Sequence, residues 1–293
     1  MTGVILKAIS GFYYVSNDGQ VYECKARGNF RNNQVSPMVG DKVEFTVTQD
    51  LFGVVEKVFE RKNLLTRPLI ANMDKIFIVS SYTVPSPDTL MIDRLTAISV
   101  FHGIEPIIVF NKCDMGDFTD FEKIYKNSGF KTYVVSAKDG IGIDELKNET
   151  KNCISAFIGN SGVGKSSILN AVFGDLQLKT GEVSKKLGRG RHTTRHTELF
   201  PHGFGGFVAD TPGFSSLEAM SENSYDFKMN LAESFADFDE FLGRCRFTSC
   251  THTCEKGCAV LEAVSKGLIE ESRHKSYKTM FDELKDIKPW NSK

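Results

Sequence analysis

Residues 159–166 read Gly159-Asn160-Ser161-Gly162-Val163-Gly164-Lys165-Ser166 and match the pattern G-x-x-x-x-G-K-[ST]. An apolar run precedes this segment and a helix-forming run follows it, which is the context that a phosphate-binding loop requires. The glycines let backbone N–H groups point at phosphate oxygens, and the N-terminus of the following helix adds favourable partial charge. We expect all eight residues and the adjacent Ser167 to bind a nucleotide, with Lys165 at the β- and γ-phosphates and Ser166 at Mg²⁺.

A second motif on the phosphate side is Asp210-Thr211-Pro212-Gly213, which follows an apolar strand predicted at 205–209. A carboxylate at the end of such a strand supports the metal ion, so Asp210 is the expected second Mg²⁺ group, and the N–H of Gly213 should sense the γ-phosphate. The basic segment before it contains Thr193, Thr194 and two glycines, which suit a loop that the nucleotide orders. One threonine should close over Mg²⁺, and we favour Thr194. A solvated basic loop is the alternative.

Two further loops predict that the base is guanine. Asn111-Lys112-Cys113-Asp114 follows one predicted strand, and Ser136-Ala137-Lys138 follows another. Guanine presents an N1–H and an N2 amino group side by side, and the carboxylate of Asp114 can accept both. Adenine lacks this pair of donors and would leave the carboxylate unpaired, a mismatch that costs about 10⁴–10⁵ in discrimination. We expect Asn111 to tie this loop to the phosphate loop, the Lys112 stem to cover the base, and a backbone N–H of 136–138 to meet O6 of guanine.

From about residue 70 the chain alternates strands and helices, which is the pattern of a parallel sheet covered by helices. The long apolar runs of the strands agree with burial on both faces of the sheet. The predicted strands are 75–80, 106–110, 132–135, 154–158 and 205–209, and the predicted helices are 88–101, 119–127, 142–151 and one that begins at Lys165.

Residues 1 to about 65 instead contain about five short runs of β-branched or aromatic residues separated by turn residues. This predicts a small β-barrel, of which the OB-fold is one form and an SH3-like barrel the alternative. One loop carries Phe30 among basic residues, which suits base stacking and phosphate neutralisation. A charged helix predicted at 269–286 is a second candidate RNA contact, although a solvated face is the alternative for both. The basic candidates are Lys25, Arg27, Arg31, Arg273, His274, Lys275, Lys278 and Lys285.

The tail contains a cluster of metal-ligand residue types, Cys245-x₄-Cys250-x-His252-x₅-Cys258. Three thiolates and one imidazole make a tetrahedral structural zinc site with no open position for catalysis. Cys254 lies inside the same stretch and is a rival for one of the ligand positions. Free cysteines in a small core are the alternative to a metal. Zinc binding would supply folding energy to a short segment with little apolar core.

Length and composition are those of an ordinary globular protein with two or three domains. The 293 residues are 41% hydrophobic and 25% charged, with a formal net charge of −1, so the overall charge gives no sign of a nucleic-acid partner. No apolar run approaches the roughly 18 residues needed to span a membrane, and the N-terminus lacks the pattern of a secretory signal. We therefore expect a cytoplasmic protein with no membrane partner.

The order of the motifs is unusual, because the base loops precede the phosphate loop and Asp210 follows it. In most GTPases the phosphate loop comes first and the base loops come last. With a β-barrel in front and a Cys/His cluster behind, the chain resembles the small-ribosomal-subunit-dependent GTPase A family, circularly permuted GTPases that act in bacterial ribosome assembly. The resemblance implies an OB-fold RNA-binding domain at 1–65, a permuted GTPase domain at 66–220 and a zinc-binding helical domain at 221–293. It also favours a zinc set without Cys254.

This resemblance further implies that the chain hydrolyses GTP to GDP and phosphate on the small (30S) ribosomal subunit and its rRNA, with nucleotide state controlling docking and release. We expect a monomer that carries one structural Zn²⁺ and uses Mg²⁺ with GTP. Competing interpretations are a passive RNA-binding scaffold that uses GTP structurally, and an ATP-dependent kinase or transporter subunit. Asp114 speaks against the second of these.

The residue that aligns the attacking water does not come from the D-x-x-G motif. Ras-like enzymes have a glutamine directly after its glycine, whereas this chain has Phe214, whose side chain has no hydrogen-bonding group. His192, beside Thr193, is the best candidate, and the resembled family assigns its catalytic histidine to this place. A solvated loop histidine is the alternative. We expect a slow intrinsic rate that the ribosomal subunit raises by ordering this loop.

Overall fold

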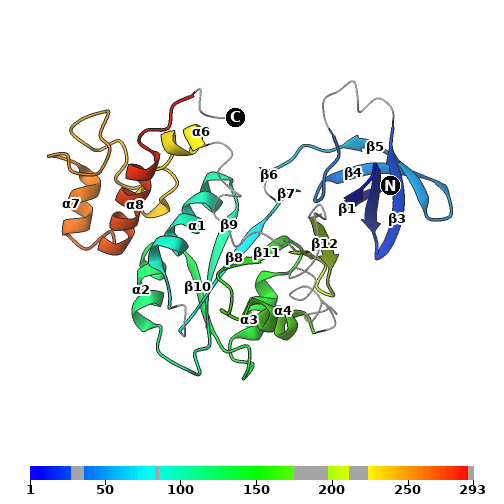
Figure 1. Ribbon diagram of the computed structural model, residues 1–293, viewed down its shortest axis with the longest axis horizontal. Coiled ribbons are helices and arrows are strands. Elements are labelled where there is room, and N and C mark those ends of the chain that lie inside the picture. The colour runs from blue at the N-terminus through cyan, green and yellow to red at the C-terminus, as the bar shows by residue number, and fades with distance from the viewer. Residues whose placement is uncertain (28–35, 67, 83–85, 175–196, 211–223, 290–293) are drawn as a thin grey trace, which may run out of the picture.

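A computed structural model describes residues 1–27, 36–66, 68–82, 86–174, 197–210 and 224–289. Figure 1 shows three parts along the longest axis of the molecule, with a small barrel at one end, a sheet with helices in the centre and a group of helices at the other end. This is the architecture that the sequence predicts. Within the described part of the chain, none of the helices has both the length and the apolar character needed to cross a bilayer.

The N-terminal part is a closed barrel with the strand order β1-β2-β3-β5-β4. Antiparallel pairs make most of the barrel, and β3 runs parallel to β5. Buried residues alternate with exposed ones along the strands, and the inward side chains of Ile5, Val15, Cys24, Phe45 and Val55 are fully buried. This arrangement confirms the predicted OB-like barrel. Its strands are β1 (Thr2–Ile9), β2 (Phe12–Asn17), β3 (Gln20–Ala26), β4 (Lys42–Gln49) and β5 (Phe52–Val58).

A short hairpin, β6 (Leu64–Thr66) and β7 (Leu69–Ala71), joins the barrel to the central part. The N–H of Ala71 donates to the carbonyl of Val39 over 2.8 Å, so the hairpin is tied to the barrel. Gly40, at φ +87°, lies so close to the carbonyl of Ala71 that no side chain would fit between them. The hairpin was not predicted, because each of its strands is only three residues long.

The central part is a six-stranded sheet with the order β10-β9-β8-β11-β13-β12. Five strands are parallel, and the edge strand β12 pairs with β13 in the antiparallel sense. β12 is absent from the predicted strands, since it is only four residues long and ends in a proline. The strands are β8 (Lys75–Ser81), β9 (Glu105–Asn111), β10 (Lys131–Val135), β11 (Ile154–Ile158), β12 (Glu198–Pro201) and β13 (Phe207–Asp210).

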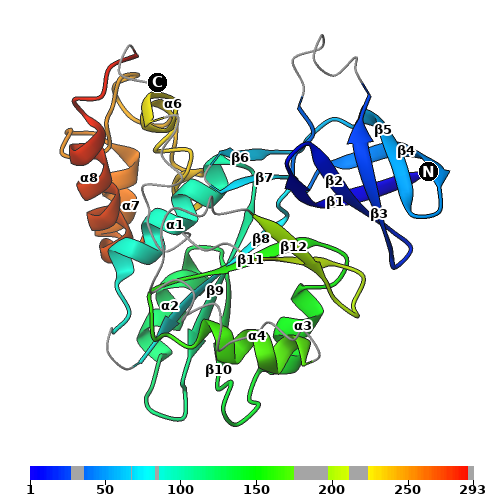
Figure 2. The same cartoon turned by 45° about the vertical axis from the view of Figure 1, so that its right-hand side comes forward.

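Helices cover both faces of this sheet, as Figure 2 shows. α1 (Thr89–Phe101) and α2 (Thr119–Asn127) pack on one face, and α3 (Ile143–Glu149) and α4 (Lys165–Phe173) pack on the other. Alternate residues of β8 serve the two sides, since Ile76 and Ile78 belong to the core under α1 and α2, whereas Phe77 and Val79 belong to the other core. The sheet is therefore buried on both faces, as its continuous apolar strands predict.

The C-terminal part consists of α6 (Ser224–Met229), the 3₁₀-helix η3 (Ala236–Phe238), α7 (Ala259–Ser265) and α8 (Glu271–Leu284). It packs against α1, and the two share one apolar cluster that includes Ala97, Phe235, Phe238 and Tyr277. Figure 1 shows α8 alongside α1. The zinc-ligand candidates lie in the loops between η3 and α7, so α1 is the platform that supports this part.

A fully buried arginine joins α8 to the central part. Arg273 donates from Nη1 to Asp93 Oδ1 of α1 over 2.9 Å and from Nη2 to Asp237 Oδ1 over 2.7 Å. Its guanidinium also lies over the rings of Phe130 and Phe235, at 5.1 and 4.7 Å from their centroids. Two carboxylates and two rings thus compensate for the removal of one cation from water.

Candidate nucleotide site and metal centre

The predicted nucleotide-binding loops all follow the carboxyl ends of parallel strands. Residues 111–114 come at the end of β9, residues 136–138 follow β10, and the phosphate loop follows β11. Because β9, β10 and β11 are parallel members of one sheet, these loops emerge at the same edge. This is the edge at which open α/β sheets bind their ligands.

Asn111 connects the three loops. Its side chain is buried, with an exposed fraction of 2%. Nδ2 donates to the carbonyl of Val163 in the phosphate loop over 2.9 Å, and Oδ1 accepts from the N–H of Ala137 over 3.2 Å. Lys112 adds a second link, since its Nζ donates to the carbonyl of Gly162 over 2.8 Å. The structure thus brings together the segments that the sequence assigns to the base and to the phosphates.

The phosphate loop has the backbone that its glycines allow. Gly159, Gly162 and Gly164 have φ values of +144°, +86° and +94°. At Gly164 a side chain is also excluded by space, because a β-carbon would lie 2.3 Å from Asn111 Nδ2. Gly164 is the N-cap of α4, so the amide groups of the first turn of the helix face the mouth of the loop, where an anion is favoured.

Lys165 is the first residue of α4, and its ammonium group lies inside the loop. Nζ donates to the carbonyls of Gly159 and Asn160 over 2.7 and 2.8 Å. Burial lowers the pKa of Lys165, because the low-dielectric surroundings disfavour the charged form. A phosphate in the loop would provide this ammonium with a negatively charged partner. Ser161, Ser166 and Ser167 are exposed at the same loop and helix terminus.

The carboxylate of Asp114, which is predicted to read the base, contacts a buried serine. Ser136 is fully buried. Its Oγ lies 2.9 Å from Asp114 Oδ1 and 3.1 Å from Asp139 Oδ2, either of which can accept its one hydrogen, and it accepts from the N–H of Asp139 over 3.2 Å. Lys138 Nζ lies 3.9 Å from Asp114 Oδ2. The Asp114 loop is also fixed to β10, since the N–H of Cys113 donates to the carbonyl of Val135 over 3.1 Å. The carboxylate is therefore oriented before any base arrives.

The remaining predicted residues of the nucleotide site lie largely outside the described residues. His192, Thr193, Thr194 and the segment with Gly213 and Phe214 are among these. Asp210 is described only through its backbone, as the last residue of β13 opposite Glu198 of β12. Its backbone is at the carboxyl edge of the sheet, next to the phosphate-loop strand β11.

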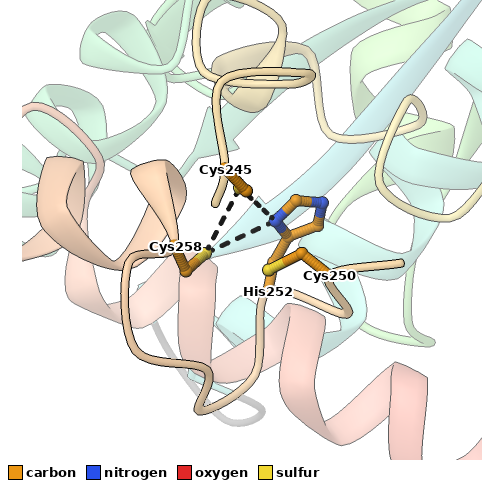
Figure 3. Close-up of side chains that lie close together, drawn as sticks. All are labelled: Cys245, Cys250, His252 and Cys258. Carbon is orange, nitrogen blue, oxygen red and sulfur yellow. Dashed lines mark hydrogen bonds between the residues drawn. The ribbon is translucent and has the colours of Figure 1, made fainter. Parts of the chain in front are cut away.

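The four predicted metal ligands come together in the C-terminal part, where their ligand atoms lie within 4.8 Å of one another. Figure 3 shows the side chains of Cys245, Cys250, His252 and Cys258 turned toward one another. The Sγ atoms of Cys245 and Cys258 are 3.8 Å apart, and His252 Nδ1 lies 3.5 and 3.4 Å from them. Tetrahedral Zn–S and Zn–N bonds of ordinary length would separate two sulfurs by about 3.8 Å and a sulfur from a nitrogen by about 3.6 Å. The donor set and its spacing therefore fit zinc.

Backbone groups of the following helix support the thiolates. Cys258 is the N-cap of α7 and accepts at Sγ from the N–H of Leu261 over 3.5 Å. Cys245 Sγ accepts from the N–H of Ala259 over 3.3 Å. These donors stabilise negative sulfur at a helix N-terminus. Burial lowers the pKa of His252, which favours the neutral imidazole that binds metal.

Outer contacts hold the loop that carries His252, whose φ of +59° is unusual for a residue with a side chain. From α8, Tyr277 donates its hydroxyl to the carbonyl of Thr251, and His274 Nε2 lies against the carbonyl of His252, both over 2.8 Å. The carboxylate of Glu255 accepts from the hydroxyl and N–H of Thr251 and from two further N–H groups. Burial alone would raise the pKa of Glu255, but these hydrogen bonds outweigh it and lower the pKa to about 2.

Cys254 lies apart from the four clustered side chains. It is exposed, and its Sγ contacts Thr253 Oγ1 at 3.7 Å. Sequence reasoning leaves Cys254 open as a rival ligand and does not find Glu255, because one acidic residue between cysteines carries no recognisable signal.

The structure corrects part of the predicted RNA-contact set. Arg273 and His274 are buried, because both face the core between α8 and its neighbours, so the expectation that they contact RNA is wrong. Lys275, Lys278 and Lys285 of the same helix are exposed. On the barrel, Lys25 lies over the ring of Phe12, with Nζ 5.0 Å from the centroid, and Arg27 is exposed. Phe30 and Arg31 lie outside the described residues.

Comparison with known proteins agrees with this geometry. The family model described as RsgA GTPase matches residues 58–220, and the one described as RsgA N-terminal domain matches residues 2–55. A protein named small ribosomal subunit biogenesis GTPase RsgA from Caldanaerobacter subterraneus subsp. tengcongensis is 42% identical over 97% of this chain and 96% of its own length. One of the same name from Halalkalibacterium halodurans is 43% identical over 97% of each.

Two crystal structures show the same fold. YjeQ from Thermotoga maritima superposes with a TM-score of 0.81 at 36% identity, covering 98% of this chain and 99% of that one. YloQ, described as a circularly permuted GTPase, gives a TM-score of 0.81 at 35% identity, covering 98% and 96%. The permuted order of motifs that the sequence shows is therefore compatible with this fold, since a solved structure of the same fold is described as circularly permuted.

Proposed function

The chain belongs to the RsgA family of circularly permuted GTPases, and we propose that it hydrolyses GTP in the late assembly of the small (30S) ribosomal subunit. The observation that carries the proposal is the convergence on Asn111 of the phosphate loop and the two base loops. The convergence of these loops supports triphosphate cleavage as the chemistry. The relatives' printed names supply the setting in which this chemistry is used.

In this proposal Asp114 accepts the N1–H and N2 amino hydrogens of guanine, and Ser136 keeps its carboxylate in the required orientation. The Lys112 stem covers one side of the base. Lys165 leaves the carbonyls that it now contacts and binds the β- and γ-phosphate oxygens. The amide groups of residues 159–166 surround the phosphates, and those of 136–138 meet O6 of guanine.

Mg²⁺ is the ion that a GTPase uses to neutralise charge on the transferring phosphoryl group. Ser166 at the start of α4, Asp210 at the end of β13 and Thr194 are the residues that would hold it. His192 is the residue that we propose to orient the attacking water, since Phe214 offers no hydrogen-bonding group in the position that follows Gly213.

The two outer parts of the molecule are proposed to bind the ribosomal subunit. Support comes from the OB-like barrel, a form that binds oligonucleotides, and from the exposed Arg27 directly after β3; the candidates Phe30 and Arg31 follow it in the sequence and lie outside the described residues. The Cys₃His cluster is proposed to hold one structural Zn²⁺, bound by Cys245, Cys250, His252 and Cys258. We place the protein in the cytoplasm as a monomer, with the domain boundaries 1–65, 66–220 and 221–293.

The decisive experiment measures GTP turnover by the full chain with and without purified small ribosomal subunits. Multiple turnovers that the subunits accelerate strongly are expected. A passive RNA-binding scaffold would bind the subunits and GTP but show no stimulated turnover. Competition of ATP against GTP addresses the kinase or transporter alternative, which requires ATP to displace GTP at comparable concentration.

Nucleotide state is proposed to control docking, with GTP favouring binding to the subunit and GDP favouring release. Such control requires that the subunit bind the two nucleotide forms with different free energy. Cosedimentation with GDP and with a non-hydrolysable GTP analogue measures this difference. Equal affinities in the two states would remove docking control while leaving the GTPase activity untouched.

A further inference from the structure

Tyr82 lies beside the loop that carries Asp114, although it belongs to none of the nucleotide-binding motifs. It directly follows β8, whose last residue, Ser81, pairs with Asn111 of β9. Its ring rests on Gly116, two residues after Asp114. A β-carbon at Gly116 would lie 2.2 Å from Cε1 of the ring and 2.3 Å from Cδ1 and Cζ. The ring therefore occupies the space that any side chain at position 116 would need.

A chain of rings ties Tyr82 to the core. Tyr82 meets Phe118 edge-on, with centroids 5.7 Å apart and an interplanar angle of 87°. Phe118 stacks on Phe110 at 5.0 Å, and both are almost completely buried. Phe110 immediately precedes Asn111. The ring of Tyr82 is thus fixed relative to the strand from which the base loop starts.

The loop needs such support because its backbone is strained. Lys112 has a φ of +70°, a left-handed conformation that is unfavourable for a residue with a side chain and persists only when its surroundings enforce it. The N–H of Met115 donates to the carbonyl of Lys112 over 2.9 Å, which closes a turn around Asp114. Ser136 contacts the carboxylate within this turn, and the ring of Tyr82 lies close to Gly116 at its end.

The simpler role for Tyr82 is to cover apolar surface, but its position is poor for that purpose. Its exposed fraction is 45%, so much of the ring remains in water, and besides the edge-on contact with Phe118 the ring lies close to the backbone of Gly116. Gly116 has no positive φ to explain the absence of a side chain. The close approach of the ring explains why position 116 is a glycine.

We propose that Tyr82 is a positioning residue for guanine selectivity, which it serves by holding the turn 112–116 so that Asp114 meets both donors of guanine at once. The inference rests on the proposed function. A carboxylate that accepts two hydrogen bonds needs a defined orientation, whereas one that accepts a single bond tolerates rotation. Loosening the turn should therefore weaken recognition of the 2-amino group more than it weakens binding of the phosphates.

The test compares GDP with inosine diphosphate, which lacks the 2-amino group, as displacers of a fluorescent GDP analogue from the full zinc-loaded chain. Tyr82→Ala should weaken GDP binding about two- to tenfold, the range expected for one lost aromatic contact. Inosine diphosphate should lose less, so the affinity ratio of the two falls. In turnover, KM for GTP should rise while kcat at saturation is retained. Tyr82→Phe keeps the ring and should match the unmodified chain.

Gly116→Ala provides the second variant. Its methyl group would move the ring away from the turn, although residue 82 is still a tyrosine. It should reduce the same affinity ratio. The proposal is overturned if both variants keep the ratio of the unmodified chain, or if they weaken GDP and inosine diphosphate equally, which is the result for a purely structural role. A chain that prefers neither GDP nor inosine diphosphate over ADP before any substitution would instead overturn the proposed function.

Discussion

At the scale of single residues, the side chains of the proposed nucleotide site form hydrogen bonds with one another and with the backbone. Asn111 uses both ends of its side-chain amide to bind the loops at Val163 and Ala137, and the hydroxyl of Ser136 contacts the carboxylate of Asp114. Lys165 contacts the carbonyls of its own loop. The hydrogen bonds of Asn111 and Ser136 can persist when the nucleotide binds and so lower the cost of ordering these groups, whereas Lys165 must exchange its carbonyl partners for phosphate oxygens.

Replacing the base-reading carboxylate should change which base is bound. In Asp114→Asn, the side-chain amide can donate to the 2-oxo group of xanthine but opposes the 2-amino group of guanine. We expect GTP affinity to fall on the order of 10²-fold, consistent with loss of a charged hydrogen-bond acceptor for two donors, and xanthosine triphosphate to bind in preference. Competition binding with both nucleotides measures the exchange. Unchanged GTP affinity would contradict the assignment of Asp114.

Replacing the proposed water-orienting residue should affect catalysis alone. His192→Ala is expected to reduce subunit-stimulated turnover about 10²-fold or more, the contribution typical of a positioned acid–base group, with little change in GTP affinity. Single-turnover hydrolysis on purified small subunits gives the rate, and equilibrium binding gives the affinity. As a matched variant, His192→Gln keeps a hydrogen-bonding side chain at this position and should lose less of the stimulated turnover. A stimulated rate that His192→Ala leaves unchanged would reject His192.

Single residues also show where reading the sequence succeeds and fails. The phosphate and base loops were predictable because each is a short motif directly after a predicted strand, and parallel strands place such loops at one edge of the sheet. Arg273 was not, because a cation in an amphipathic helix looks the same in sequence whether it faces water or two buried carboxylates. Its partners Asp93 and Asp237 are 180 and 36 residues away in the chain, and they come together only because α8 packs against both α1 and η3.

At the scale of elements, a carboxylate at the end of α3 fastens the strands of the sheet. Glu149 accepts from Lys75 of β8 over 2.5 Å and from Lys131 and Tyr133 of β10 over 3.1 and 2.8 Å. Burial alone raises the pKa of Glu149, but these hydrogen bonds outweigh it and lower the pKa to about 2 from an ordinary 4.5. Three donors from two strands thus depend on one ionised group.

Acid should remove the contribution of Glu149 to stability. Because the folded pKa is the lower one, the stabilisation is complete above about pH 4.5 and is lost as the pH falls toward 2. Glu149→Gln should lower the free energy of unfolding by about 1.5–3 kcal/mol at pH 7, with a deficit that shrinks in acid. Urea unfolding at pH 7 and pH 3 measures both. Glu105→Gln, a more exposed partner of the same lysines, should cost less, and an equal deficit at both pH values would contradict the mechanism.

The proposed metal centre should make the fold of α7 and the preceding loops dependent on zinc. Chelation should reduce the helical signal of the C-terminal part while GDP binding changes little, because the ligand loops contact α7 and α8 rather than the nucleotide loops. Circular dichroism and GDP affinity, measured after confirmed zinc removal, follow the two effects. Cys254→Ser should retain one zinc per chain and Cys258→Ser should lose it. Helicity that survives complete metal removal would count against a folding role for zinc.

Elements were predictable to the degree that they bury a regular pattern. The barrel strands and the strands of the parallel sheet have long apolar or alternating runs, and they fold where the sequence predicts them. The β6–β7 hairpin and β12 lack such runs, since they have three or four residues each. Their pairing comes from neighbours that are already in place, namely Val39 of the barrel and the buried strand β13.

At the scale of the whole molecule, the C-terminal part is joined to the central part by the buried group of Arg273, Asp93 and Asp237. Arg273→Met should lower the free energy of unfolding by about 3–5 kcal/mol, because two buried carboxylates lose their counter-charge. Urea unfolding followed by circular dichroism measures the loss. Arg94→Met removes an ion pair between the same two helices, with Glu283, that is partly exposed, and should cost under about 1 kcal/mol. Equal effects of the two substitutions would contradict the role given to burial.

The barrel is likewise more than an appended domain, because its first strand lies against β12. Lys7 Nζ meets Glu198 Oε2 at 2.9 Å, and Leu6 and Leu199 belong to one apolar cluster. An outermost strand offers unpaired N–H and C=O groups on which a strand of another chain can add. The barrel covers this edge strand. Removing the barrel would therefore expose β12 and give the remaining domain a tendency to self-associate.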